Sequence, residues 1–449
     1  MERSRDSGRV KGGPSAGAEI PGPVSQDFIR RGDRAISSAA RIPFYPLVVE
    51  SARGSVIWDS DGREYIDFLS AACVANTGHN HPRVVEAIKK QADKLIHYNL
   101  AYAYTEEAVR LSEELARITP GSQEKRVAFG LSGSDANDCA IKLVRQATGR
   151  PAVISYLRSY HGATYGALSL SAVSLPMRRK MGPILPGVFH IPYPDCYRCR
   201  VSPSGECGLQ CLSALTDLFE TACPPDEAAA IFIEPIQGDS GVIVPPDEYM
   251  VKLGQICDRH GILLVSEEVQ TGFGRTGRWF AIEKWPVEPD VVIMGKAMAS
   301  GMPISAVVGR RELFEGWEAP AHALSTSANP VSCAAAMATI RVIEEERLIE
   351  KSRADGQYLV ARFREMAERH PLIGDVRGEG LMIGVDLVTD RGSRERAVKE
   401  TAKVAFAAWQ RGLFVTFFSR SVLRIAPPLV ITRSEIDRAL DILDESFAA

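Results

Sequence analysis

The first regular hydrophobic pattern in the chain is an alternating stretch between residues 44 and 68. The alternation breaks at residues 52–54 and 60–62. A period of two indicates half-buried strands, and short glycine-containing breaks indicate tight turns. The stretch therefore predicts three antiparallel strands. From Pro82 onward, apolar residues recur at three- and four-residue spacing, which predicts a helix that begins at this proline.

Six short runs in the middle of the chain are apolar throughout. They comprise residues 126–130, 152–156, 229–233, 262–265, 291–294 and 304–308. Such runs, separated by helix-length segments, are typical of parallel strands covered by helices on both faces. The first five runs are followed by GSDAN, YHG, EPIQG, EEVQTG and GK. Because ligands bind beyond the carboxyl ends of strands in an open parallel sheet, these polar sequences predict an active site there.

From about residue 334 the pattern changes to long amphipathic helices. Strands are predicted at 381–387, 413–418 and 422–426, with helices at 394–411 (ended by Gly412) and after the capping box Thr432-x-x-Glu435. This predicts a smaller α+β domain. We divide the chain into a disordered tail (1–24), an N-terminal segment with a helix and antiparallel strands that packs with the small domain (25–68), a large domain (69–333) and a C-terminal small domain (334–449).

Charge and composition narrow the function classes. The 449 residues include 53 Lys or Arg and 56 Asp or Glu, a net charge of −3. This near-neutral balance argues against a polybasic nucleic-acid binder. The apolar runs are much shorter than the roughly 18 residues of a membrane span, and no secretion signal is found. We therefore expect a cytoplasmic, multidomain protein with no nucleic-acid or membrane partner.

Four of the nine cysteines form a cluster: Cys196, Cys199, Cys207 and Cys211. Four thiolates at close spacing can bind tetrahedral zinc, which would be structural because no coordination position stays open. The spacing is irregular compared with zinc ribbons, so we favour a surface excursion whose thiols are free or reversibly paired. No catalytic metal is expected.

Two of the polar sequences contain groups that could bind a phosphate or form a Schiff base. Gly133 and Ser134 lie in a small-residue turn before a helix predicted to begin near Asp135. Their amides and the Ser134 hydroxyl would form a phosphate cradle, with a plain N-cap serine as the alternative. Lys296 follows the run 291–294 beside small residues, which suits an amine that forms a Schiff base, although a solvated lysine is commoner.

Two further positions suit an aromatic cofactor ring. Glu267 and Glu268 end a strand, and adjacent strand residues point to opposite faces, so only one carboxylate can face a cofactor. Placed there, it would keep a pyridine nitrogen protonated. Tyr160 would lay its ring against the cofactor, although a core aromatic is the commoner case. His161 is expected to be a hydrogen-bonded structural histidine.

Taken together, these sequences resemble the class III (ω-amino acid) aminotransferases, which use pyridoxal 5′-phosphate (PLP). The resemblance covers about residue 40 to the end and rests on LSGSDANDCAIKLVR, SYHGATYGALSLS, AAIFIEPIQGDSG, LLVSEEVQTGFGRTGRWFA and VIMGKAMASGMPISAVV. IPYPDCYR, HPLIGDVRGEGL and LRIAPPLVIT are similar to amino acid racemases and epimerases of the same fold. The resemblance implies an α/β protein of the PLP-dependent transferase fold type I. Its large domain, a mostly parallel sheet between helices, would bind PLP, and a homodimer would form the site at its interface.

The resemblance also implies a role for each candidate residue. Lys296 would form the Schiff base and carry the proton, with Glu267 as its catalytic partner at the ring nitrogen. The remaining cofactor contacts would come from Gly133 and Ser134 (phosphate), Tyr160 (ring stacking) and Gln270 (phenolic oxygen). Glu234 looks like the family's gating or substrate-side glutamate. Arg424 matches the arginine that receives the substrate α-carboxylate, for which a bidentate donor is suited.

This chain departs from the family pattern at several positions. Glu267 stands where the family normally has Asp, one methylene shorter. The threonine that is donated across the dimer to the phosphate is replaced by Ser325, with Thr326 as an adjacent alternative. Ala163 replaces an arginine of many 4-aminobutyrate and acetylornithine enzymes. Asp239 aligns with a family glutamate, which leaves its pairing with Arg424 open.

The favoured interpretation is an aminotransferase that moves an amino group from an amino acid or ω-amine donor to a 2-keto acid. Gln270 and the intact QTGFGRTG favour it over the alternative, an amino acid racemase or epimerase, which returns the proton to the substrate carbon. A catalytically inactive scaffold is disfavoured because Lys296 and the phosphate cradle are both present.

Overall fold

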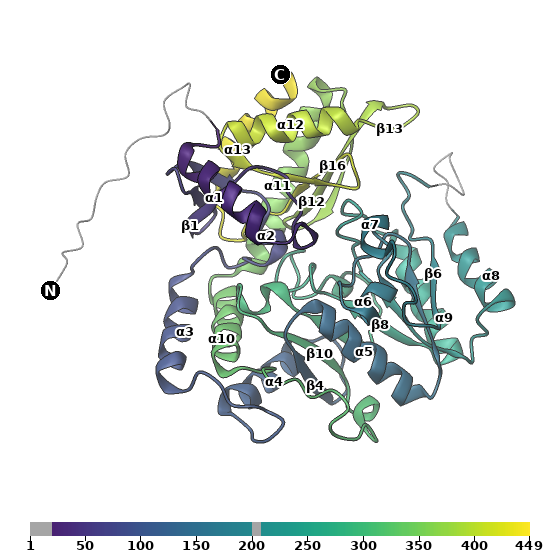
Figure 1. The fold of residues 1–449 in the computed structure, drawn as a ribbon. Coiled ribbons are helices and arrows are strands. Elements are labelled where there is room, and N and C mark those ends of the chain that lie inside the picture. The colour runs from purple at the N-terminus through teal and green to yellow at the C-terminus, as the bar shows by residue number, and fades with distance from the viewer. Residues whose placement is uncertain (1–19, 200–207) are drawn as a thin grey trace.

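The computed structural model describes residues 20–199 and 208–449 (Figure 1). Its centre is a seven-stranded sheet with the strand order β4-β10-β9-β8-β7-β5-β6. The strands are β4 (Lys125–Gly130), β5 (Ala152–Tyr156), β6 (Val188–Ile191), β7 (Ala228–Ile233), β8 (Leu263–Glu267), β9 (Val291–Met294) and β10 (Ser305–Arg310). All six predicted runs are strands, and β6 is an additional edge strand whose residues are mostly half-buried.

One strand of this sheet runs against the expected direction. β10 pairs antiparallel with both β4 and β9, whereas the other pairings are parallel. The physical reason is the connection: β9 ends at Met294 and β10 begins at Ser305, and a parallel crossover needs about a dozen residues or more. The carboxyl ends of β4, β5, β7, β8 and β9 still meet at one edge of the sheet.

Both faces of the central sheet are buried, as the unbroken apolar runs require. Phe232 of β7 packs in one core cluster with residues of α5 (Gly133–Thr148), whereas its neighbours Ile231 and Ile233 pack in another with residues of α9 (Asp247–His260). Because successive strand residues point to opposite faces, these two helices cover the sheet from opposite sides. The other helices before residue 335 are α1 (Pro23–Ala35), α2 (Ser70–Cys73), α3 (Pro82–Lys94), α4 (Glu106–Ile118), α6 (Tyr165–Leu170), α7 (Leu175–Arg178), α8 (Ser213–Thr221) and α10 (Pro330–Glu345).

A second sheet is built from the C-terminal part of the chain. Its order is β11 (Ile373–Glu379), β12 (Met382–Asp390), β16 (Val422–Ile425) and β15 (Thr416–Phe418), and β13 (Glu395–Arg396) pairs with β12. The helices α11 (Leu348–Arg369), α12 (Val398–Gln410) and α13 (Arg433–Ala448) accompany it. The capping box before α13 is confirmed: Thr432 and Glu435 bond each other's backbone amides.

The N-terminal strands form a third sheet with part of the C-terminal region. β1 (Val49–Arg53), β2 (Val56–Asp59) and β3 (Glu64–Asp67) are the predicted antiparallel meander, and β14 (Leu413–Phe414) adds to β3 in parallel. The predicted strand 413–418 is thus two strands, β14 and β15, in different sheets. The domain boundaries at 69 and 334 stay predictions.

The start of the described chain differs from the predicted tail. α1 begins at Pro23, inside the range 1–24, and the Asp61 carboxylate accepts hydrogen bonds from the amides of Val24 and Ser25. A proline at the first helical position and an anchoring carboxylate explain why helix replaces tail there. Residues 1–19 of the predicted tail lie outside the described residues.

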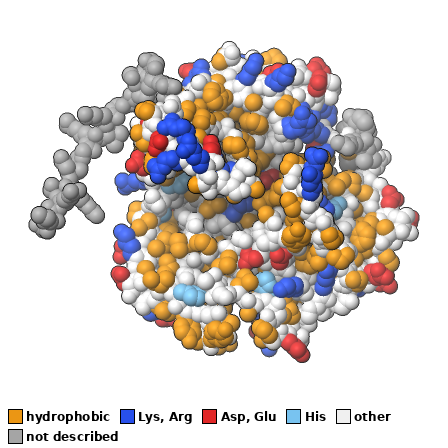
Figure 2. All heavy atoms as spheres, viewed as in Figure 1, with side chains coloured by type: hydrophobic (Ala, Val, Ile, Leu, Met, Phe, Trp, Pro, Cys, Tyr) orange, Lys and Arg blue, Asp and Glu red, His pale blue; other side chains and the backbone are white. Residues whose placement is uncertain are grey.

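In Figure 2 the Lys and Arg side chains and the Asp and Glu side chains are interspersed over the visible face. Among the helices of residues 20–199 and 208–449, none combines the length and the apolar character that a membrane crossing requires.

Candidate active site

A cavity of about 280 Å³ opens at the carboxyl edge of the central sheet. Six predicted site residues line it together: Gly133, Ser134, Tyr160, Glu267, Gln270 and Lys296. They lie at or after the carboxyl ends of β4, β5, β8 and β9, as the polar sequences there predicted. His161, Val74 and the loop 301–304 also line the cavity, and the sequence interpretation had not assigned them to it. The signal for His161 was its place directly after Tyr160.

The first turn of α5 faces this cavity. The helix begins at Gly133, two residues before the predicted start, with Ser132 as its N-cap and Asp135 completing a capping box. Ser134 is therefore not the N-cap, and its hydroxyl instead accepts a hydrogen bond from the amide of Ala163 at 3.1 Å. The first amides of a helix have no intrahelical partner and lie at its positive end. The turn is thus shaped and charged to hold a phosphate group.

The two adjacent glutamates point to opposite sides of β8. Glu267 lines the cavity, and its carboxylate accepts the Val269 amide at 2.8 Å and lies 3.2 Å from His161 Nδ1. Glu268 points into the core, where it accepts hydrogen bonds from the amides of Ala281 and Ile282, each at 2.9 Å. Burial raises the pKa of Glu268 to about 7. Only Glu267 can therefore act on a group in the cavity.

Lys296 enters the cavity from an uncommon backbone conformation. It directly follows Gly295 after β9 and has a φ of +45°. Left-handed non-glycine residues cost free energy and cluster at functional sites, where the surrounding structure holds them. The strand end and the left-handed turn thus place one primary amine in the cavity that the first turn of α5 also lines.

The buried Arg424 forms an ion pair with the half-buried Asp239 beside the cavity. Arg424 Nη2 donates to Asp239 Oδ1 at 2.6 Å, and Gln270 Nε2 donates to the same oxygen at 2.9 Å. Burial alone would raise the pKa of Asp239, but the charges of Arg424 and Lys296 and the two hydrogen bonds lower it below its usual value. The pairing that the sequence left open is therefore present. Arg424 and Asp239 do not line the cavity themselves but reach it through Gln270.

Glu234 lies beneath the site. Its two carboxylate oxygens accept the amides of Tyr160 at 2.9 Å and of Gly238 at 3.0 Å. Burial, and then the nearby charge of Glu267, raise the pKa of Glu234 to about 8. Glu234 therefore fixes the loops that contain Tyr160 and Asp239. Its side chain does not line the cavity.

The remaining candidates lie elsewhere. Ser325 and Thr326 are exposed in the segment before α10 and do not line the cavity. Cys196, Cys199 and Cys211 line a second cavity, of about 320 Å³. Within residues 20–199 and 208–449, no group of three or more His, Cys, Asp or Glu side chains is close enough to hold a metal ion. Cys207 lies outside the described residues.

These residues fit PLP on the evidence of the structure itself. The N-terminus of α5 offers backbone amides that suit a phosphate group, and a Cβ on Gly162 would lie 2.3 Å from Ser134 Oγ, so a glycine is required where the loop crosses that turn. An aromatic ring, a carboxylate and an amine line the same cavity. The mostly parallel sheet with this cavity at its carboxyl edge defines a PLP-dependent transferase of fold type I.

Comparison with known proteins identifies the family. Residues 37–447 match the class III aminotransferase family. The chain is 47% identical to a leucine/methionine racemase of Thermococcus litoralis (94% of this chain, 95% of the relative). It is 48% identical to an isoleucine 2-epimerase of Lentilactobacillus buchneri (92% of each). It is 37% identical to a 5-aminovalerate aminotransferase of Pseudomonas aeruginosa (90% and 94%).

A solved structure agrees with this result. A Bacillus anthracis aminotransferase superposes with a TM-score of 0.88 at 30% identity, over 95% of this chain and 98% of that one. The chain belongs to the class III aminotransferases. It is a PLP-dependent enzyme that transfers amino groups, and both the cofactor and the fold expected from the sequence are confirmed.

Proposed function

We propose that this aminotransferase acts on α-amino acids with apolar side chains, and that Arg424 receives the α-carboxylate. This proposal rests on the burial and the hydrogen bonding of the Arg424 guanidinium. Arg424 is 1% exposed, and its Nε and Nη1 are buried without a hydrogen-bond partner among the described residues. Buried donors are nearly always paired, and a guanidinium N–H forms a strong, charge-assisted hydrogen bond with a carboxylate. An apolar side chain fits the names of the racemase and epimerase relatives.

The residues that line the cavity would perform the remaining steps. PLP supplies the electron sink for the bond that breaks at the substrate carbon. The first amides of α5 would bind its phosphate, and the Tyr160 ring would pack against its ring. Glu267 would hold a proton at the ring nitrogen, and Lys296 would take the proton from the substrate α-carbon. Gln270 connects the cavity to Asp239 and Arg424, and these two residues would orient the amino acid.

Racemisation or epimerisation is the second candidate reaction of the same site. It shares proton removal with transamination but returns the proton to the same substrate carbon from the opposite face. The specific observation in its favour is identity: 47% and 48% to a racemase and an epimerase, against 37% to an aminotransferase.

One experiment separates the two reactions. The PLP-loaded enzyme is incubated with a single amino acid, such as L-leucine, in D2O without any keto acid. Stoichiometric conversion of PLP to its amine form, with one equivalent of keto acid released, indicates transamination. Deuterium incorporation at the α-carbon with loss of optical rotation and intact PLP indicates racemisation. If no apolar amino acid shows either result, the substrate proposal is wrong.

The role proposed for Lys296 has its own test. Borohydride reduction of the wild-type enzyme should fix the cofactor covalently to the peptide that contains Lys296, detected by mass spectrometry. Lys296→Ala should lose this adduct and multiple-turnover transamination. Lys252→Ala, which removes an exposed lysine of α9, should retain both. Sustained turnover by Lys296→Ala would contradict the assignment.

We further propose a homodimer in which Ser325 or Thr326 of one subunit approaches the phosphate of the other. Both side chains are exposed and outside the cavity, and Tyr102 and Tyr104 are 82% and 87% exposed on a segment with further large apolar residues. Large exposed aromatic residues are typical of protein interfaces. Sedimentation should show a dimer, and a Ser325→Ala/Thr326→Ala double variant should bind PLP more weakly. A monomer with unchanged PLP affinity would contradict this. The cytoplasmic location stays a prediction.

A further inference from the structure

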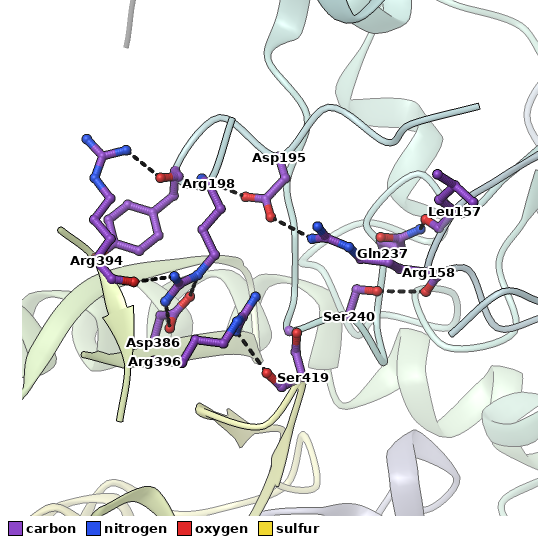
Figure 3. A network of polar contacts seen from close by, with 12 residues as sticks. Leu157, Arg158, Asp195, Arg198, Gln237, Ser240, Asp386, Arg394, Arg396 and Ser419 are labelled. Carbon is purple, nitrogen blue, oxygen red and sulfur yellow. Dashed lines mark hydrogen bonds and ion pairs between the residues drawn. The ribbon is translucent and has the colours of Figure 1, made fainter. Parts of the chain in front are cut away.

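A buried aspartate, Asp386, connects three segments that are distant in the sequence. It lies on β12 and is fully buried. Arg198 donates to both of its carboxylate oxygens, Nε to Oδ2 at 3.1 Å and Nη2 to Oδ1 at 2.7 Å. Arg377 of β11 and the Ser421 hydroxyl also donate to it, at 3.4 and 3.2 Å. Figure 3 shows the Arg198 guanidinium against the Asp386 carboxylate.

Arg198 reaches Asp386 from a segment next to the central sheet. It lies in the segment 192–199, which leaves the central sheet after its edge strand β6. This segment is itself fixed: the Arg198 amide donates to Asp195 Oδ1, and Arg158 Nη1 donates to Asp195 Oδ2, each at 3.2 Å. The bidentate pair therefore ties the cofactor-binding sheet to the sheet that contains Arg424 (Figure 3).

The strand that contains Asp386 also packs against Arg424 and against the loop that contains Asp239. Across the β12–β16 pairing, Gly384 lies opposite Arg424 and Asp386 opposite Val422. A Cβ on Gly384 would lie 2.7 Å from the Gly241 carbonyl oxygen, so the loop that contains Asp239 packs directly on this strand. Arg377 holds the same loop by donating to the Gly241 oxygen at 2.7 Å. Asp386 thus accepts hydrogen bonds from Arg198 and from Arg377, the arginine that fixes the Asp239 loop.

We propose that Arg198 is a positioning residue for amino acid binding: by holding Asp386, it sets where Arg424 stands relative to the cofactor cavity. This inference rests on the proposed function, in which Arg424 receives the α-carboxylate. Arg424 is on the C-terminal sheet, whereas Lys296 and Glu267 belong to the central sheet. Their separation therefore depends on contacts between the sheets, and a displaced Arg424 would bind the substrate carboxylate more weakly, which raises the half-saturating concentration.

The test compares four variants of the PLP-loaded enzyme: Arg198→Gln, Arg198→Lys, Arg424→Gln and Arg391→Gln. Arg391 is the matched control, because its guanidinium donates to the Ile373, Ala367 and His370 carbonyls within the C-terminal region and not to the Asp239 loop. The readout is α-proton exchange of L-leucine in D2O by NMR, which reports on both candidate reactions. Each variant gives a half-saturating leucine concentration and a maximal rate, and PLP absorbance and thermal unfolding report the state of the fold.

We expect Arg198→Gln to raise the half-saturating concentration about tenfold with a maximal rate within about threefold of wild type. Arg198→Lys should recover part of the loss, since it keeps the charge but not the bidentate geometry. Arg391→Gln should behave as wild type. An unchanged half-saturating concentration in Arg198→Gln, or an equal change in Arg391→Gln, would overturn the inference. If instead Arg424→Gln leaves that concentration unchanged, the carboxylate role in the proposed function fails, and the positioning role fails with it.

Discussion

Replacing Gly162 with alanine tests whether the first turn of α5 is shaped around a phosphate group. Gly162 lies in the loop after β5 and has a φ of +136°, a conformation that residues with a Cβ rarely adopt. An added Cβ would lie 2.3 Å from Ser134 Oγ and 2.7 Å from Ser134 Cα. Because the second atom belongs to the helix backbone, a side-chain rotation cannot relieve the contact, and the turn itself must shift.

The size of the effect follows from two costs. Forcing an extra carbon into a packed site costs about 1–3 kcal/mol, and the strained backbone costs about as much again. The backbone cost is paid in the apoprotein too, whereas the shift of the α5 turn acts where the phosphate binds. If about 2 kcal/mol falls on the turn, PLP should bind roughly 30-fold more weakly.

The assay is a titration of apoenzyme with PLP, followed by the absorbance of the bound cofactor. Gly149→Ala is the matched control, because Gly149 caps the other end of α5 at φ +67° and an added Cβ there would point into open space. The control should lose stability by a comparable backbone cost but bind PLP as wild type does. Equal PLP affinities in the two variants would refute the proposal that this turn holds the phosphate.

Two further predictions concern the buried carboxylates. Glu267→Gln should lower kcat about 100-fold or more with a smaller change in PLP affinity, because it removes a charge at the proposed ring-nitrogen site, whereas Glu267→Asp should retain most of the rate. Steady-state kinetics of the loaded enzymes check this, and a Gln variant as active as wild type would rule it out. Glu234 has its pKa raised to about 8 by burial and by Glu267, so the protein takes up a proton there on folding. The free energy of unfolding should then fall as pH rises from about 5 to 8, because the unfolded chain loses this proton at a lower pH than the folded protein does. In thermal unfolding, Glu234→Gln should show a weaker fall, and identical pH slopes would contradict this.

The position of the cofactor cavity could be predicted because it depends on local patterns. The runs at β4, β5, β7, β8 and β9 are apolar without alternation, and such strands are stable only when both faces are covered. A parallel arrangement then places the residues after each strand at one edge. The sequence also showed that Glu267 and Glu268 must point to opposite faces, since the side-chain period of a strand is two.

Other features needed contacts that no local pattern contains. Which glutamate faces the cavity depends on how β8 lies between α5 and α9, and the direction of β10 depends on its short connection from β9. The local pattern does not predict β6, because most of its residues are only half-buried at the edge of the sheet.

The sequence by itself determined the chemistry of this protein: a lysine, a carboxylate, an aromatic ring and a helix N-terminus at the ends of buried strands. Only the tertiary structure decided how that chemistry meets its substrate. Arg424 and Asp239 are 185 residues apart, and Arg198 and Asp386 are 188 apart. The reason is physical: strand and helix patterns arise from the spacing of neighbouring residues, whereas ion pairs between sheets form only after separate segments have packed together.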